Sequence, residues 1–104
     1  MSTLSTHVLD TSLGKPAAGI RVLLLRDGGA VAEGMTDADG RARFSTSVTP
    51  GEYCIRFEVH PYFRTTGRES FYRVITIEFV VRDEEHYHVP LLLSPFGYST
   101  YRGS

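Results

Sequence analysis

Short stretches in which apolar and polar residues alternate recur along this 104-residue sequence. Glu52–Val59 is the clearest, because Tyr, Ile, Phe and Val occupy every second position. Successive side chains of a β-strand point to opposite faces, so this spacing predicts a strand with one face in a core. We expect further strands, separated by turns rich in Gly, Pro or Asp, at Thr3–Asp10, Gly19–Arg26, Ala30–Met35, Ala42–Phe44, Val74–Val81, His86–Ser94 and Tyr98–Arg102.

Seven or eight short strands with turn signals between them favour an all-β fold, a two-sheet antiparallel β-sandwich. His60–Gly67 is the one segment with helical features, because Pro61 suits a first helical turn and the closing glycine suits a C-terminal cap. A chain of this length fits one domain, so we expect residues 1–104 to form a single sandwich with one short helix. Leu23 and Leu25 fall on the outer face of the second strand, which favours a further contact surface, such as another subunit.

The overall composition argues against several classes of function. The net charge is −1, and neither a basic excess nor a charged block points to nucleic acid. No apolar run approaches the roughly 20 residues of a membrane helix. The first residues lack the basic and apolar regions of a secretory signal, and the single Cys54 cannot form an internal disulfide. We therefore expect a cytoplasmic protein without nucleic-acid or membrane partners.

Two histidines on one strand are candidates for chemistry. His86 and His88 are two residues apart, so their side chains share a face of the predicted strand. Together with His7 they offer three imidazoles, a ligand set of some catalytic zinc sites. Histidine also suits proton transfer near neutral pH, because its ordinary pKa is about 6.5. Two half-exposed surface histidines would give the same pattern, and the residues alone leave the three interpretations open.

Arg41 directly follows the polar turn Thr36–Gly40 and is open to two interpretations. It could pair with Asp37 or Asp39 at the surface, a contact that contributes only about 0–1 kcal/mol. It could instead present a permanently charged fork to a carbonyl oxygen or a developing oxyanion. The turn lacks the spaced ligands and final Glu of an EF-hand, so we do not expect it to bind calcium. Cys54 has no positive cluster beside it, so a nucleophilic role is not expected.

Three motifs resemble the 5-hydroxyisourate hydrolase family, the transthyretin-related enzymes of urate breakdown. They are Leu4–Asp10 near the start, Thr36–Arg41 in the middle, and His86–Ser104 with its closing Tyr-Arg-Gly-Ser. The resemblance covers essentially the whole chain and implies a two-sheet sandwich with one short helix. It further implies hydrolysis of 5-hydroxyisourate to 2-oxo-4-hydroxy-4-carboxy-5-ureidoimidazoline without metal or cofactor. A homotetramer built as a dimer of dimers, with pockets between the dimers, is also implied.

Carried over position by position, the resemblance also implies the site. The catalytic residues would be His7, Arg41, His88 and Ser104, and His86 would support them. The substrate-binding residues would be His7, Arg41, Tyr101, Arg102, Gly103 and Ser104, with no metal ligands.

Two alternatives of other classes stay open. A transthyretin-like carrier of small ligands would share the fold but lack the Tyr-Arg-Gly-Ser ending. A structural prealbumin-like module would need neither the His-Tyr-His motif nor a fixed C-terminus.

Overall fold

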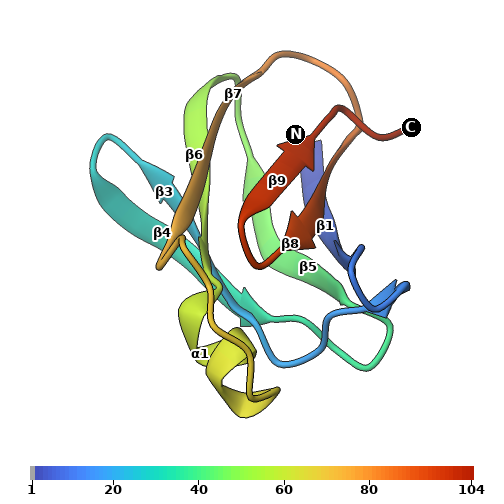
Figure 1. The fold of residues 1–104 in the computed structure, drawn as a ribbon. Helices are drawn as coiled ribbons and strands as arrows, with labels where there is room; N and C mark the ends of the chain where they lie inside the picture. Colours follow the sequence, from blue (N-terminus) through green and yellow to red (C-terminus); the bar gives the residue numbers. More distant parts are fainter. Residues whose placement is uncertain (1) are drawn as a thin grey trace.

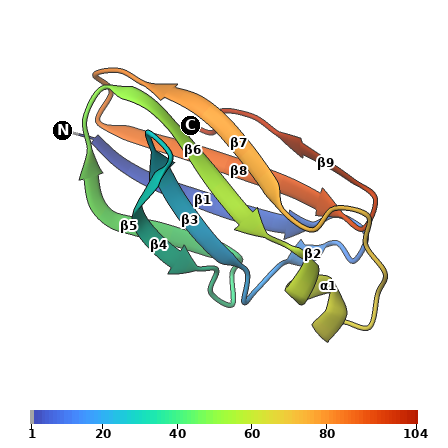
Figure 2. The same cartoon turned by 90° about the vertical axis from the view of Figure 1, so that its left-hand side faces the viewer.

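The computed structural model describes residues 2–104, which form two β-sheets packed face to face with one short helix beside them (Figures 1 and 2). One sheet joins β5, β1, β8 and β9, with β2 paired to the end of β1, and the other has the order β4-β3-β6-β7. The strands are β1 (Ser2–Asp10), β2 (Lys15–Pro16), β3 (Arg21–Arg26), β4 (Gly29–Met35), β5 (Arg41–Val48), β6 (Gly51–Glu58), β7 (Ile75–Val81), β8 (His86–Ser94) and β9 (Gly97–Thr100), and the helix is α1 (His60–Thr65).

The predicted two-sheet sandwich with one short helix is confirmed, with differences in detail. The last strand, β9, ends at Thr100 and not at the predicted Arg102. Residues 2–104 contain nine strands, because the two-residue β2 lies in a segment read as a loop. β5 extends to Val48, beyond the predicted end at Phe44. β1 and β8 run parallel, so the larger sheet is mixed and not purely antiparallel. These two strands are far apart in the sequence, and no short hairpin forces them to run in opposite directions.

The core lies between the two sheets and is built from the inward-facing positions of the alternating segments. Leu4 and Val8 of β1, Ile55 and Phe57 of β6, and Leu91 of β8 have no exposed surface. Each such large apolar side chain contributes roughly 1.5–3 kcal/mol relative to an exposed position. Because the side chains alternate between the two faces of a strand, the residues between these core positions point outward and are available for chemistry.

The helix α1 follows directly after β6 and packs on the end of the sandwich, as Figure 2 shows. Pro61 lies in its first turn, and Gly67 follows its end with a φ of 70°, a conformation that favours glycine. Tyr62 and Phe63 are its buried residues. Within residues 2–104, no helix is long and apolar enough to cross a membrane.

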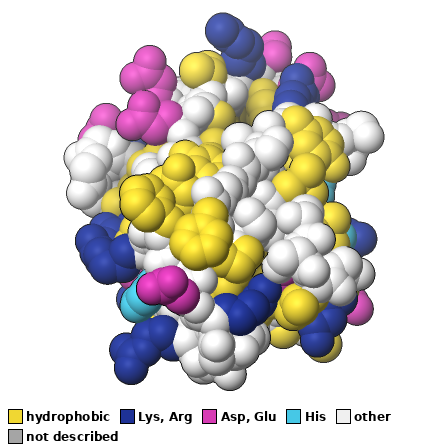
Figure 3. All heavy atoms as spheres, viewed as in Figure 1, with side chains coloured by type: hydrophobic (Ala, Val, Ile, Leu, Met, Phe, Trp, Pro, Cys, Tyr) yellow, Lys and Arg dark blue, Asp and Glu magenta, His cyan; other side chains and the backbone are white. Residues whose placement is uncertain are grey.

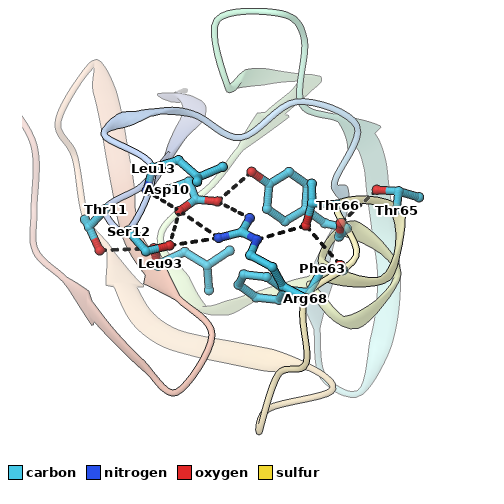
Figure 4. A network of polar contacts seen from close by, with 10 residues as sticks. Asp10, Thr11, Ser12, Leu13, Phe63, Thr65, Thr66, Arg68 and Leu93 are labelled. Carbon is cyan, nitrogen blue, oxygen red and sulfur yellow. Dashed lines mark hydrogen bonds and ion pairs between the residues drawn. The ribbon is translucent and has the colours of Figure 1, made fainter.

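A buried polar network ties this helical region to the end of β1 (Figure 4). Asp10 has no exposed surface and accepts hydrogen bonds from Arg68 Nη2 at 2.5 Å and from the Tyr62 hydroxyl at 2.7 Å. Burial alone would raise the pKa of Asp10, but hydrogen bonds from Arg68, Tyr62, Ser12 and the Leu13 N–H outweigh it and hold the pKa well below its usual value. Asp10 is therefore an ionised anchor that fixes one end of the strand that carries His7.

Candidate active site

The two inner strands β1 and β8 and the neighbouring β5 bring the predicted catalytic side chains together. The antiparallel pairing of β1 with β5 sets His7 opposite Arg41, and the parallel pairing with β8 sets Ser5 opposite His88. Leu4, Thr6 and Val8 point into the core, so His7 and Ser5 lie on the outer face of the sheet. Three chain segments far apart in the sequence therefore place two imidazoles and a guanidinium on one surface.

A glycine turn positions Arg41 beside this strand. Gly40 has a φ of 74°, and a Cβ added there would lie 2.4 Å from the Val8 carbonyl oxygen. This close approach lets the Val8 N–H donate a 2.7 Å hydrogen bond to the Gly40 carbonyl. The turn is thus held against β1, and only glycine fits there without displacing the backbone.

The guanidinium of Arg41 does not form the surface ion pair considered from the sequence. The ion pairs found within residues 2–104 involve neither Arg41 nor its neighbours in the turn. The contact between Arg41 and Asp37 is made by the backbone: the Arg41 N–H donates to Asp37 Oδ1 at 3.0 Å. That hydrogen bond is the main reason why the pKa of Asp37 lies below its usual value. The charged end of Arg41 stays exposed and available to a ligand.

His88 is half-buried between the other candidate groups. Its ring centroid lies 6.5 Å from that of His7 and 6.5 Å from that of His86. Its Nδ1 is hydrogen-bonded to Ser5 Oγ at 2.9 Å. Burial lowers the pKa of His88, and the neighbouring His7, His86 and Arg41 lower it further, which outweighs a hydrogen bond with the Ser5 backbone that raises it. The imidazole is therefore neutral near pH 7, the form that a general base requires.

The end of the chain returns to His88. Gly103 bridges to it and donates a 2.9 Å hydrogen bond from its N–H to the His88 carbonyl oxygen. A Cβ added at Gly103 would lie only 2.5 Å from His88 Cδ2 and 3.2 Å from Pro90 Cγ. Only the absence of a side chain lets the terminal segment lie against the imidazole, and this contact brings the exposed Ser104 to the same region.

Arg102 and Tyr101 are placed differently from the other predicted binding residues. The guanidinium of Arg102 lies over the ring of Tyr87, 5.1 Å from the ring centroid. Tyr87 is buried and points to the opposite face of β8 from His88. A groove of about 250 Å³ on this side is lined by Tyr87, Tyr101 and Arg102 among others, and it reaches His88 but neither His7 nor Arg41. Within one chain, Arg102 therefore does not share the face of the catalytic candidates.

The three histidines do not form a converging ligand set. Within residues 2–104, no group of three or more His, Cys, Asp or Glu side chains is placed to hold a metal ion. The ring centroids of His7 and His86 each lie 6.5 Å from that of His88, and the Nδ1 of His88 is hydrogen-bonded to Ser5. Cys54 lies on β6 in the other sheet, and burial raises the pKa of its thiol, which disfavours the reactive thiolate.

Two residues of the site were not identified from the sequence. Ser5 contacts both His86 and His88, and Thr3 contacts His86 Nδ1 at 2.5 Å. The alternation placed Ser5 on the face of His7, but nothing local indicates that this strand pairs with the segment from His86. The sequence pattern does not predict that β1 and β8 pair in parallel, and this pairing brings Ser5 and Thr3 to the two histidines.

Comparison with known proteins agrees with the fold and the motifs. Residues 4–103 match the model of the HIUase/Transthyretin family. The chain is 45% identical to a 5-hydroxyisourate hydrolase of Caulobacter vibrioides, with both chains covered completely. It superimposes on the 5-hydroxyisourate hydrolase of Klebsiella pneumoniae with a TM-score of 0.93 at 45% identity, again over all of both chains.

A more distant structural neighbour is sea bream transthyretin in complex with thyroxine. It has a TM-score of 0.84 and 30% identity over 96% of this chain and 93% of that chain. Both the family match and the full-length similarity lead to the same assignment: the chain belongs to the HIUase/Transthyretin family.

Proposed function

We propose that this protein is an enzyme that hydrolyses 5-hydroxyisourate to 2-oxo-4-hydroxy-4-carboxy-5-ureidoimidazoline in urate degradation. The observation that carries the proposal is the placement of His7, Arg41 and His88 on one outer face, with the segment from Gly103 lying against His88. Full-length relatives with that name support the same activity. The carrier alternative is not favoured, since sea bream transthyretin is less similar, at 30% identity.

The site suits opening of a cyclic amide by water. 5-Hydroxyisourate is a flat bicyclic compound that carries several carbonyl and N–H groups. A neutral histidine takes a proton from the attacking water, and a histidine returns a proton to the leaving nitrogen. His88 and His7 supply these groups, and the neutral state of His88 follows from its lowered pKa. The Arg41 guanidinium stabilises the carbonyl oxygen as negative charge develops on it.

The remaining predicted residues form the wall of the pocket in this proposal. Tyr101, Gly103 and Ser104 bound the substrate on the side of β9, and the Ser104 hydroxyl contacts it. Arg102 contributes to binding after it leaves the ring of Tyr87, or from a neighbouring subunit. The chemistry requires neither a metal ion nor a cofactor.

We also propose that residues 1–104 act as one domain in a cytoplasmic homotetramer, a dimer of dimers. The face with His7, Arg41 and His88 is an open sheet surface in one chain, so a second subunit is needed to enclose a substrate. Hydrophobic side chains gather on one face of the molecule (Figure 3). β7 and β9 are edge strands of the two sheets, and Val80 of β7 and Tyr98 of β9 are 48% and 44% exposed. Such exposed apolar surface favours association.

The direct test is the decay of freshly generated 5-hydroxyisourate, followed by its ultraviolet absorbance with and without the protein. The proposal predicts a decay proportional to enzyme concentration that chelators do not reduce. Light scattering on the same sample measures the mass at micromolar concentration. A spontaneous rate that the protein does not change would refute the activity, and a stable, fully active monomer would refute the tetramer.

A further inference from the structure

Four polar side chains form a continuous chain of hydrogen bonds across β1 and β8, on the face of the proposed site. Thr3 Oγ1 lies 2.5 Å from His86 Nδ1, and Ser5 Oγ lies 3.1 Å from His86 Nε2. Ser5 Oγ also lies 2.9 Å from His88 Nδ1. The parallel register explains the pattern, because it sets Thr3 opposite His86 and Ser5 opposite His88. The hydroxyls of Thr3 and Ser5, on the outer face of β1, therefore each contact an imidazole of β8.

One assignment of donors and acceptors satisfies all of these contacts, starting from the outer end of the chain. Thr3 Oγ1 is 3.5 Å from the Glu85 carbonyl oxygen, which can only accept. With the Thr3 hydroxyl donating to that carbonyl, Thr3 accepts from the Nδ1–H of His86. The Nε2 of His86 then accepts from the Ser5 hydroxyl, and Ser5 accepts from the Nδ1–H of His88. In this arrangement His88 Nε2 carries no proton, so its lone pair is free.

We propose that Ser5 is a positioning residue, which with His86 and Thr3 behind it orients the His88 ring and holds its Nε2 unprotonated toward the substrate. The inference rests on the proposed function and adds the protonation state that makes His88 the general base. It also gives His86 a defined task, because His86 fixes the direction of the Ser5 hydroxyl without touching substrate.

The surroundings of His88 support this arrangement. The ring is held at Nδ1 by Ser5, and its Cδ2 edge faces Gly103. Within residues 2–104, no protein group is hydrogen-bonded to its Nε2. The charged or titratable groups near it are His7 on β1, Arg41 on β5 and His86 on β8, and all disfavour the imidazolium. A ring kept neutral exists as one of two tautomers, and the hydrogen bond at Nδ1 selects which one.

The test compares Ser5→Ala, which removes the hydroxyl, with Ser5→Thr, which keeps it on a residue suited to a strand. Ser47→Ala, at an exposed position of β5, is the control. In the hydrolysis assay, Ser5→Ala should lower kcat about 10- to 100-fold, the scale of a misplaced catalytic group, with KM nearly unchanged. Ser5→Thr should restore most of kcat, and Ser47→Ala should match the unchanged protein.

A second measurement does not depend on turnover. Nitrogen-15 NMR of the histidine rings at about pH 8, above the ordinary histidine pKa, reports the tautomer of each neutral ring. The proposal predicts that His88 is protonated at Nδ1 in the unchanged protein, and that Ser5→Ala gives a mixture of tautomers. Wild-type kcat in Ser5→Ala, or an unchanged His88 tautomer in that variant, would overturn the inference. Failure of the proposed function would instead abolish turnover in every sample while leaving the NMR result in place.

Discussion

Replacing Gly103 by alanine tests whether the terminal segment sets the geometry of His88. The added Cβ would lie 2.5 Å from His88 Cδ2, about 1 Å closer than the 3.4–4 Å of ordinary van der Waals contact. The imidazole is rigid and its Nδ1 is held by Ser5, so either the ring or the terminal segment must move by about that distance. A 1 Å misplacement near a reacting group costs about 10²-fold in rate, and we expect that loss in kcat/KM.

The fold itself should tolerate this change, because Gly103 lies beyond the last strand and outside the core. The matched control is Gly97→Ala in the β8–β9 hairpin, where the nearest atom to an added Cβ is Ser94 Oγ at 3.6 Å. The assay pairs the initial rate on fresh substrate with thermal melting of the same sample. Wild-type kcat/KM in Gly103→Ala, or an equal loss in Gly97→Ala, would show that the contact with His88 does not set the rate.

Further predictions concern the catalytic groups, the terminal segment and pH. Alanine at His7, Arg41 or His88 should lower kcat/KM at least about 10²-fold in the decay assay without loss of folding by circular dichroism. Deleting residues 102–104 should lower the rate by orders of magnitude with little change in melting temperature, and loss of rate only in proportion to stability would contradict this. The pKa of His88 is lowered from 6.5, so the acid limb of a kcat/KM–pH profile should lie below pH 6.5. Asp10→Asn should destabilise the fold by about 3–5 kcal/mol in urea unfolding, because Arg68 loses its buried partner.

The stabilising effect of Asp10 has a defined pH dependence. Its pKa is lower in the folded protein than its ordinary value of 3.8, so the unfolded chain binds the proton more readily. The stabilisation is therefore complete above about pH 4 and is lost as the pH falls through the folded-state pKa. The stabilisation by Tyr62 depends on pH in the opposite direction. Burial, and then the hydrogen bond to Asp10, raise the pKa of Tyr62 from 10 to about 12. Its contribution is present below pH 10 and is lost between pH 10 and 12.

The local features of this fold are the ones that the sequence predicts. The alternation in Thr3–Asp10 correctly separates the buried Leu4 and Val8 from the outward-facing Ser5 and His7. Pro61 and the glycine after the helix mark the limits of α1, because both act through backbone geometry within a few residues. Such signals require no knowledge of distant parts of the chain.

The non-local features could not be predicted from the pattern. The sequence pattern places Asp10 at the end of a strand and Arg68 in a loop. In the structure they form an ion pair, with 2.5 Å between Arg68 Nη2 and Asp10 Oδ2. Arg102 belongs to the most specific motif, but its stacking on Tyr87 depends on how the terminal segment crosses the edge of the sheet. Each of these contacts is decided by tertiary packing between segments that share no local signal.

β1 links the stability of the fold to the proposed chemistry. Its outer face carries His7 and Ser5, its inner face supplies core residues, and its last residue is the anchored Asp10. The parallel pairing with β8 sets the register between Ser5 and His88, so a shift by one residue would turn Ser5 to the opposite face and break the contact. The ion pair between Asp10 and Arg68 holds the end of β1 and opposes such a shift. We therefore expect substitutions at Asp10 to affect kcat through the register of β1 even where the protein stays folded.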